Sequence, residues 1–581
     1  MKKLFLFTFL FIVSTLFLVC VLEDESAEDN ATATGSDFSA DETVYINLTD
    51  KTYSLDGSSY SADSLTTTEV SIFDNTVYLS YDESTGLLVV DATDASKKIG
   101  VSLSGTLSTG GVKIQTNNED EIGLYLNSVT ITSSNYPCVD ITKGSAASVF
   151  VEGENTFTDG REYGYGYGDS YSTSSNPKTE DGSDSKGTLV CKGGISLSGS
   201  GSLTVKQAYK NCIASKAGYL EIESGTYTLF NYTYDSTEPL SKYSSIQSSG
   251  VGKNGAFGAQ GVIVAGGAVS FYGCGIVSSS DIRKANGFKT DDDDYSSSYV
   301  TISGGTVNVV TYNGKGITAP YVNITGGTNT FTVEGSTTYA EAGDNPKTVS
   351  GYDADGCSAT ITLKFAPEGV EGSNEVNVSG GTTEIKATDD AINASESSGK
   401  VSISAGNLYV YSTGGDGVDS NGDIYISGGN VVSYAPNGSE DAYDCGDSNK
   451  IYLTGGVIAG TCGSSNGISS FSTSEQKVLY FKGSSQSGGR TAPNSSSSSS
   501  SFSAVAVKMS GSTKYAYSLP SSSWGLFVMS CSDFTSSSSS GYTVYINPEN
   551  LPNDFNGLCT SSTTLDSVSD VGSSTKTPSI K

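Results

Sequence analysis

A short acidic pattern returns at nearly constant intervals in the second half of the chain. Asp390-Ala391-Ile392-Asn393 is followed by Asp416-Gly417-Val418-Asp419 and then by Asp441-Ala442-Tyr443-Asp444. The pattern begins at positions 390, 416 and 441, so its steps are 26 and 25 residues. A fixed period of this size is typical of solenoids, because each repeat is too short to bury an apolar face alone and must stack on its neighbours.

Strand-like runs lie between the acidic turns, and each run closes with two small residues. Ile403-Ser404-Ala405-Gly406 is such a closing run, and so are Ile426-Ser427-Gly428-Gly429 and Leu453-Thr454-Gly455-Gly456. A tight corner brings backbones together and requires positive φ, which glycine adopts at little cost. Helix formers are scarce, and no long segment has helical apolar spacing. The chain is therefore predicted to be all-β, with a long solenoid as its main body.

The repeat places acidic side chains in register. If successive repeats stack as parallel strands, equivalent side chains lie about 4.8 Å apart. Asp390, Asp416 and Asp441 would then form one column, and Asn393, Asp419 and Asp444 the next. Like charges at this spacing repel by about 1 kcal/mol even in water. Carboxylate and amide oxygens suit Ca²⁺, whereas a solvated acidic turn is the alternative for any single motif.

Net charge and composition exclude several classes of function. The chain has 32 basic and 63 acidic residues, a formal net charge of −31 and no histidine. Nucleic-acid binding requires basic patches and is not expected. Ser-His-Asp and Cys-His catalysis and histidine-ligated metals are excluded as well. An acidic polymer could bind such a chain only if divalent cations bridged the two.

The first 22 residues suggest export. Residues 1–22 combine Lys2-Lys3 with an apolar run, which predicts a secretory signal peptide or, alternatively, an uncleaved anchor. In a secreted eukaryotic protein, the eight N-x-[ST] sequons of this chain, including one at Asn393, would predict glycans. We expect an acidic linker and N-terminal cap at 23–85, the repeats at 86–467, a C-terminal β cap with Ser-rich loops at 468–547 and a disordered tail at 548–581.

Two further candidates concern reactive side chains. Cys445 and Cys462 are about one turn of the repeat apart and are the first candidates for a disulfide in an oxidising compartment. Lys289 takes the place of Asn393 and Asp419 in its own repeat. A lysine with a lowered pKa near calcium could abstract a proton α to a uronate carboxylate. Alternatively, Lys289 pairs with the acidic run 291–294, which by itself is typical of a solvated loop.

Longer segments between residues 87 and 546 resemble a known family. They are similar to secreted carbohydrate-binding β-helix proteins that bind calcium and acidic sugars such as polygalacturonate, with a fold similar to family 9 pectate lyases. The segments that carry the resemblance are LNSVTITSSNYPCVDI (126–141), ENTFTDG (154–160), GSGSLTV (199–205), NGFKTDDDDYSSSYVTISGG (286–305), TDDAINAS (388–395), GDGVDSNGDIYISGG (415–429) and GYTVYI (541–546).

The resemblance implies a right-handed parallel β-helix with calcium held by aspartates between repeats. The positions that match the family's calcium ligands are Asp389, Asp390, Asp416 and Asp419, followed by Asp441 and Asp444. Asn286 and Lys315 stand where an acidic residue is usual before the turn glycine, which argues against a calcium site beside them.

Three functions follow as competing hypotheses. The first is a secreted, calcium-dependent protein that binds acidic polysaccharide of the plant cell-wall type by cation bridging, with exposed tyrosines stacking on sugar rings. The second is a calcium-dependent polysaccharide lyase with Lys289 as its base. The third is a structural surface or adhesin-like protein in which calcium serves stability alone. We favour the first, in which the chain is not an enzyme.

Overall fold

The computed structural model describes these residues: 38–55, 63–67, 69–117, 120–142, 144–160, 187–206, 211–215, 218–231, 248–253, 261–274, 276–278, 281–283, 285–290, 297–336, 346–350, 358–363, 366–472, 476–483, 502–509, 512–521, 523–549, 551, 554–560 and 574–581. The chain divides into two units, Met1–Thr32 and Ala33–Lys581, and all described residues belong to the second. The predicted signal peptide, residues 1–22, lies outside the described residues. Among those described, no helix has the length and apolar composition needed to cross a membrane.

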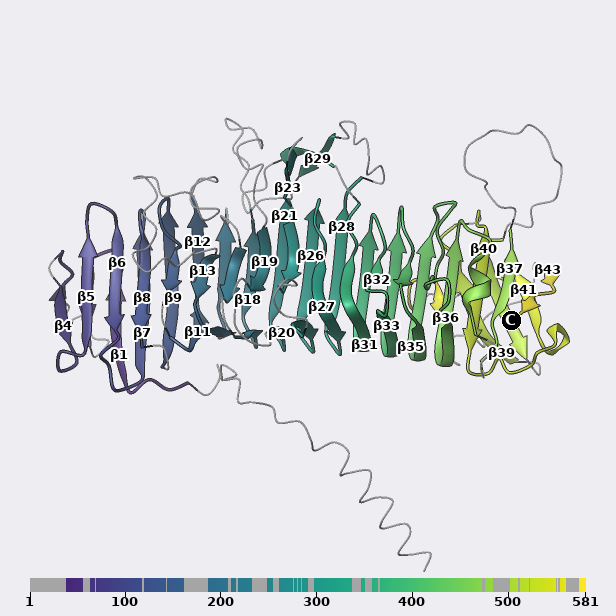
Figure 1. Cartoon of the computed structure of the whole chain (residues 1–581), viewed down its shortest axis with the longest axis horizontal. Coiled ribbons are helices and arrows are strands. Elements are labelled where there is room, and N and C mark those ends of the chain that lie inside the picture. Colours follow the sequence, from purple (N-terminus) through teal and green to yellow (C-terminus); the bar gives the residue numbers. More distant parts are fainter. Residues whose placement is uncertain are drawn as a thin grey trace, which may run out of the picture. The chain divides into compact units, whose positions relative to one another are not determined.

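The described chain is all-β, and its strands pair mainly in parallel with strands of the following repeat (Figure 1). It contains no α-helix in the described ranges, only the short 3-10 turns η4 (Gly467–Ser470) and η5 (Ser539–Gly541). The pairings form three ladders, each of which takes one strand or half-strand from successive repeats. The prediction of an all-β chain with parallel strands is confirmed.

The first ladder carries the acidic turns predicted from the sequence. Its strands are β6 (Leu87–Ala92), β8 (Gly111–Thr116), β10 (Val139–Ile141), β13 (Gly187–Cys191), β16 (Asn211–Ser215), β19 (Ser248–Lys253), β24 (Ala285–Lys289), the first halves of β27 (Ile317–Ile324) and β31 (Val370–Ala387), β32 (Ile392–Ala394) and β34 (Val418–Ser420). The antiparallel strands β4 (Val70–Ile72) and β5 (Val77–Asp82) precede β6.

The second ladder runs beside the first. Its strands are β1 (Glu42–Asn47), β7 (Ile99–Leu107), β9 (Glu121–Ser133), β11 (Ala146–Glu152), β14 (Gly194–Ser198), β17 (Leu220–Ile222), β20 (Gly261–Val264), β25 (Tyr299–Ile302), the second half of β27, the middle of β31, and the first halves of β33 (Lys400–Ser412), β35 (Ile424–Ala435) and β36 (Ile451–Cys462). The short strands β2 (Thr52–Ser54) and β3 (Asp63–Ser64) extend β1 in antiparallel fashion.

The third ladder continues the long strands past a bend. It contains the second half of β9, β12 (Glu154–Asp159), β15 (Ser202–Lys206), β18 (Thr226–Phe230), β21 (Ala268–Cys274), β26 (Thr306–Tyr312), β28 (Thr328–Glu334) and the second halves of β31, β33, β35 and β36. Two hairpins stand apart from the ladders: β22 (Ile276–Ser278) with β23 (Asp281–Arg283), and β29 (Pro346–Ser350) with β30 (Ser358–Thr362).

Alternating side chains explain why the three ladders close around one apolar core. In β34, Val418 and Ser420 are fully buried and Asp419 is half-buried; in β35, Ile424 and Ile426 are fully buried and Tyr425 is exposed. Buried valine, isoleucine and leucine from all three ladders form a single cluster. Burial of an aliphatic side chain of this size is worth about 1.5–3 kcal/mol, so the stacked repeats supply the stability that a single repeat lacks.

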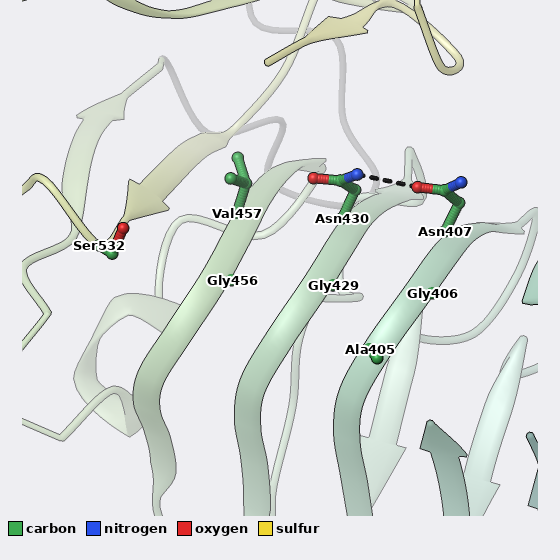
Figure 2. A pocket seen from close by; sticks show the side chains of 8 residues that line it. All are labelled: Ala405, Gly406, Asn407, Gly429, Asn430, Gly456, Val457 and Ser532. Carbon is green, nitrogen blue, oxygen red and sulfur yellow. Dashed lines mark hydrogen bonds between the residues drawn. The ribbon is translucent and has the colours of Figure 1, made fainter. Parts of the chain in front are cut away.

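The predicted glycine corners lie at the bend between the second and third ladders (Figure 2). Gly406, Gly429 and Gly456 stand at equivalent places and have φ values of +87°, +79° and +75°. A Cβ added to Gly429 would lie 2.8 Å from the carbonyl oxygen of Gly406. Both the left-handed backbone and the close approach of neighbouring repeats therefore require glycine here.

An antiparallel unit follows the last parallel strand. β40 (Leu526–Cys531) pairs antiparallel with β36 and with β37 (Leu479–Lys482), and β44 (Ser579–Ile580) extends β37. A separate sheet has the order β42 (Leu558–Cys559), β39 (Ser512–Ser518), β38 (Ala504–Met509), β41 (Thr543–Ile546) and β43 (Ser574–Lys576). Its apolar face packs in one cluster with Val432 and Ala459, so the unit also covers an outer face of the last repeats.

Candidate functional site

Two columns of polar and charged side chains run along the first ladder. The second column follows the strand register from Lys289 through Thr318, Glu371, Asn393 and Asp419, and the bridge between Val418 and Tyr443 adds Asp444. The first column lies three positions earlier in each repeat. Its members are Asn286, Lys315, Glu368, Asp390, Asp416 and Asp441. The predicted alignment of the acidic turns in two columns is thus what the pairings show.

The first column is held by hydrogen bonds from side chain to backbone. The Asp416 N–H donates to Asp390 Oδ1 at 2.7 Å, and the Asp441 N–H donates to Asp416 Oδ1 at 2.5 Å. In the same way, the Lys315 N–H donates to Asn286 Oδ1 at 2.9 Å. Each side chain therefore reaches over the next repeat and satisfies a backbone donor there, as a capping carboxylate does. The arrangement fixes one oxygen of each carboxylate and so limits where the other can point.

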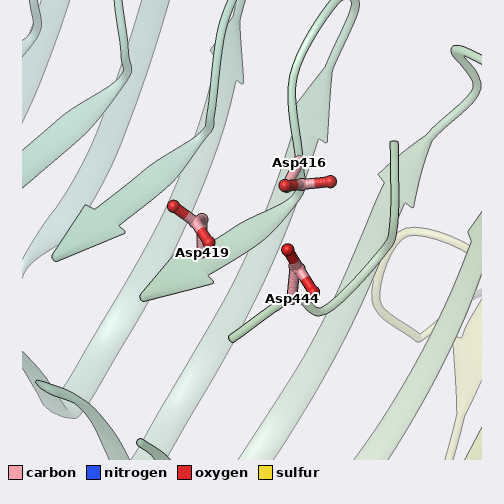
Figure 3. Close-up of side chains that lie close together, drawn as sticks. All are labelled: Asp416, Asp419 and Asp444. Carbon is pink, nitrogen blue, oxygen red and sulfur yellow. The ribbon is translucent and has the colours of Figure 1, made fainter. Parts of the chain in front are cut away.

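Asp416, Asp419 and Asp444 come together at the junction of two repeats (Figure 3). One carboxylate oxygen from each residue lies within 4.8 Å of those of the other two, and all three side chains are half-buried. Burial and the neighbouring carboxylates raise the pKa of Asp416 to about 8 and that of Asp419 to about 7, and the pKa of Asp444 is also raised. The three carboxylates thus form a site in which full ionisation is costly without a cation.

A buried amide group lies one repeat before Asp419 in the second column. Asn393 stands directly before Asp419 in the second column and is only 9% exposed. Its Nδ2 donates to Asp390 Oδ2 at 3.2 Å, but its Oδ1 is buried without a hydrogen-bond partner. An unpaired buried acceptor costs about 1–3 kcal/mol, so this oxygen needs a donor or a cation. Together, the amide and the three carboxylates offer only hard oxygen atoms.

A second acidic cluster in the same columns contains its own cation. Lys315 Nζ lies 3.1 Å from Glu368 and 2.5 Å from Glu371, and Thr318 Oγ1 donates to Glu371 at 2.9 Å. Burial disfavours the charges of Lys315 and Glu371, yet the two glutamates raise the pKa of Lys315 and the lysine lowers the pKa of Glu371. Here the protein itself supplies a cation that pairs with both carboxylates. The absence of a calcium site in the Lys315 repeat stays a prediction.

The structure brings together three of the six aspartates predicted as metal ligands. Asp390 is next to them but uses both oxygens in hydrogen bonds, and burial and like charges raise its pKa to about 9. Asp441 Oδ1 accepts the Cys462 thiol at 3.6 Å. Asp389 is half-buried, and burial together with nearby Glu368 and Glu440 raises its pKa to about 6. The role of all six as metal ligands stays a prediction.

Two other sequence-based candidates fall outside the cluster. Lys289 is four strand steps from Asp419 in the second column, which corresponds to about 19 Å at the usual strand spacing. The acidic run 291–294 lies outside the described residues. The proposed disulfide is wrong, because Cys445 and Cys462 are both buried free thiols, and Cys462 is engaged with Asp441 instead.

Glu368 and Glu371 were missed in the sequence, although a signal was present. Glu368-Gly369-Val370-Glu371 repeats the pattern of Asp416-Gly417-Val418-Asp419 with glutamate in place of aspartate. The sequence-based prediction considered only aspartates and asparagine at these positions. The longer glutamate side chains are the ones that reach the ammonium group of Lys315.

Two further surfaces on the same repeats carry polar or aromatic side chains. A shallow groove of about 450 Å³ crosses the glycine corners, where Asn430 Nδ2 donates to Asn407 Oδ1 at 2.8 Å (Figure 2). On the second ladder, the rings of Tyr425 and Tyr452 stack with centroids 5.0 Å apart. Neither surface contains the acidic cluster.

Comparison with known proteins places the chain in a family. The model of the carbohydrate-binding domain-containing protein family matches residues 89–397 and 355–511, which is more than half of the chain. The chain therefore belongs to this family, and its role is carbohydrate-related. A solved structure of a polysaccharide lyase-like protein from C. thermocellum, a gadolinium derivative, is similar at 15% identity, covering 71% of this chain and 96% of that one with a TM-score of 0.28. No curated protein matches.

Proposed function

We propose that the chain is a secreted, extracellular, calcium-dependent protein that binds acidic polysaccharide of the polygalacturonate type, and that its three ladders wind as a right-handed parallel β-helix. The observation that carries the proposal is the cluster of Asp416, Asp419 and Asp444, whose carboxylate oxygens lie within 4.8 Å of one another. Among the described residues, no lysine or arginine forms an ion pair with any of the three. Membership of a carbohydrate-binding family supports the ligand class.

Calcium fits the donor set better than a softer metal. The three carboxylates and the unpaired Asn393 Oδ1 are oxygen donors, and the chain contains no histidine. Ca²⁺ takes about 6–8 oxygen ligands, so carboxylates and one amide leave room for oxygens from elsewhere. Zinc and other borderline metals favour imidazole and thiolate ligands. The cluster is only half-buried, which leaves it accessible to a ligand from solvent.

A bridging cation resolves the electrostatic conflict between protein and ligand. The chain carries a net charge of −31, and a uronate polymer is also negatively charged. Direct contact would be repulsive at low ionic strength. A divalent cation held by Asp416 and Asp419 neutralises these two carboxylates and offers coordination positions to a sugar carboxylate. Affinity for the polysaccharide should therefore depend strictly on calcium.

The lyase hypothesis requires a base close to the cation. Lys289 is too far along the second column to serve the cluster at Asp416, Asp419 and Asp444. We therefore propose binding without bond cleavage. Incubation of the purified chain with polygalacturonate and calcium should give no ultraviolet-absorbing unsaturated product. Such a product, lost in Lys289→Ala, would establish the lyase instead.

The test is a binding titration of the full chain with polygalacturonate, with calcium and with chelator. We expect polygalacturonate to give heat of binding in the presence of calcium and none in the presence of chelator. The double variant Asp416→Asn/Asp419→Asn should lose this binding. Asp74→Asn is a matched control, because it removes a carboxylate outside the two columns. Equal binding in chelator would refute cation bridging. Calcium binding without polysaccharide binding would instead leave a structural protein that calcium stabilises.

A further inference from the structure

The aromatic pair on the second ladder is held in a fixed orientation at the surface. Tyr425 and Tyr452 stack with an interplanar angle of 12°, and Tyr425 is 41% exposed. The hydroxyl group of Tyr425 donates to Asp423 Oδ2 at 3.0 Å, which fixes the ring from its polar end. A ring held in this way loses little conformational entropy when a ligand packs on it.

One face of the Tyr425 ring has no aromatic neighbour. In the strand register, Tyr425 lies between Tyr452 and Ser402, and Ser402 is preceded by Asn377. The face that does not stack on Tyr452 therefore lies towards a serine, whose side chain is too short to cover a phenol ring. A substantial apolar ring surface is left next to hydrogen-bonding side chains.

A second stacked pair shows what a covered ring looks like. Tyr411 and Tyr434 stack with centroids 5.0 Å apart on the third ladder. There the residue that precedes Tyr411 in register is Lys386, whose Nζ lies 6.0 Å from the centroid of the Tyr411 ring. The lysine satisfies that ring face through a cation–π contact. Ser402 holds the equivalent place beside Tyr425 and supplies no such cover.

Charged groups of both signs flank the exposed ring. Lys400 lies two residues before Ser402 on the same face of the strand, and it pairs with Glu375 at 2.8 Å while remaining partly exposed. Asp423 lies next to Lys400 in register and also accepts the Lys450 N–H at 2.8 Å. The surroundings thus offer one ammonium donor, on Lys400, and two carboxylate acceptors, on Glu375 and Asp423.

We propose that the exposed face of Tyr425 binds one pyranose unit of a neutral polysaccharide, independently of calcium. The C–H face of a pyranose is apolar and packs on an aromatic ring, while its hydroxyl groups both donate and accept hydrogen bonds. Asp423 and Lys400 supply the complementary acceptor and donor. A uronate would place its carboxylate near Asp423 and Glu375 on a chain of net charge −31, so an acidic sugar is disfavoured here.

This surface is separate from the acidic columns, so its test is carried out in chelator. The full chain is titrated calorimetrically with cellohexaose and with β-1,4-galactohexaose in excess EDTA. We expect binding of at least one neutral probe, and loss of about tenfold in affinity in Tyr425→Ala. Tyr425→Phe keeps the ring and should retain affinity within about twofold.

A blocking variant distinguishes ring coverage from loss of structure. Ser402→Lys places beside Tyr425 the same residue that covers Tyr411, and it should weaken binding about as much as Tyr425→Ala, by about tenfold. Tyr411→Ala and Tyr45→Ala are matched controls and should bind normally. Tyr45 is a matched control because its side chain is 40% exposed, nearly the same as that of Tyr425. Thermal melting without ligand confirms that each variant is folded.

The outcomes separate this proposal from the calcium-dependent function. Failure of every neutral probe to bind the wild-type chain, or unchanged affinity in both Tyr425→Ala and Ser402→Lys, overturns it. Loss of calcium-dependent polygalacturonate binding in Asp416→Asn/Asp419→Asn, with neutral binding intact, supports two independent sites. Loss of neutral binding in that double variant contradicts the separation.

Discussion

Two acidic clusters in the same columns differ in where their cation comes from. Around Glu368 and Glu371, the chain supplies Lys315, which pairs with both carboxylates. Around Asp416 and Asp419, the chain supplies Asp444, a third negative charge. The strand register and the three-residue spacing are the same in both places. The difference lies entirely in side chains, so one fold can build either a closed ion cluster or a site that requires a cation from solution.

The comparison also separates the titration behaviour of the two clusters. The lysine lowers the pKa of Glu371, so that carboxylate is ionised at neutral pH. Burial and mutual repulsion raise the pKa of Asp416 to about 8, so it favours the protonated form. A cation in the second cluster must therefore displace protons, whereas the first cluster has no need of one.

Removal of the internal cation should have the largest effect. Lys315→Met leaves Glu368 and Glu371 buried and unpaired, and the loss of one partner of a buried pair costs about 3–5 kcal/mol. We expect the free energy of unfolding in chelator to fall by this amount, as measured by urea denaturation. If the two acidic clusters are equivalent, calcium should restore part of the lost stability, because the glutamates without the lysine then form a site like that of the aspartates.

Lys400→Met is the matched control for this variant. Lys400 pairs with Glu375 at 2.8 Å, but both side chains are partly exposed. Exposed pairs contribute about 0–1 kcal/mol, so a small loss that calcium does not restore is expected. An equal loss of unfolding free energy in both variants would show that burial does not make the Lys315 pairs stronger than the exposed Lys400 pair.

Calcium should stabilise the wild-type chain through the other cluster. At a calcium concentration of about 100 times Kd, a ligand that binds only the folded state adds about 2.7 kcal/mol. We expect the melting temperature to rise with calcium and fall with EDTA, and the double variant Asp416→Asn/Asp419→Asn to show neither change. Magnesium is the ionic control. A rise in the double variant equal to that in the wild type would place the calcium elsewhere.

The pH dependence of stability without calcium should have opposite signs in the two clusters. Burial and like charges raise the folded-state pKa values of Asp419 to about 7 and Asp416 to about 8, above their ordinary value of 3.8. The protonated cluster therefore stabilises the fold in acid, and this contribution is lost as the pH rises from the ordinary pKa through those raised values. The lowered pKa of Glu371 acts in the other direction, because its contribution is lost in acid.

Chemical denaturation in EDTA between pH 5 and 9 measures this difference. We expect the wild type to lose stability towards pH 9, and Asp416→Asn to lose less because it has one fewer group to ionise. With calcium, the wild type should instead hold its stability as the pH rises, since deprotonated aspartates bind the ion. Identical profiles for the two proteins in EDTA would mean that Asp416 does not titrate in this range.

The repeat allowed much of this arrangement to be predicted from the sequence. A period of 25 or 26 residues, with glycines at the corners, indicated parallel stacking and aligned Asp416 with Asp390 and Asp441. Pairing in register follows from the alternation of apolar side chains and from the turn geometry, and both repeat visibly in the sequence. The hydrogen-bond partner of each individual side chain was not predictable. Cys462 meets Asp441 rather than Cys445 because the side-chain direction depends on packing that no spacing reveals.

The smallest effect should come from the buried amide beside the aspartates. Asn393 Oδ1 has no hydrogen-bond partner, so the wild-type chain bears the cost of its burial unless a cation binds it. Asn393→Ala should lower calcium affinity by about five- to tenfold, or roughly 1 kcal/mol, in a calorimetric titration. Asn407→Ala removes an amide from the glycine corners and is the control, with unchanged affinity expected. If Asn393→Ala binds calcium as the wild type does, then the carboxylates of Asp416, Asp419 and Asp444 hold the ion without the amide, and the orphaned oxygen reflects packing alone.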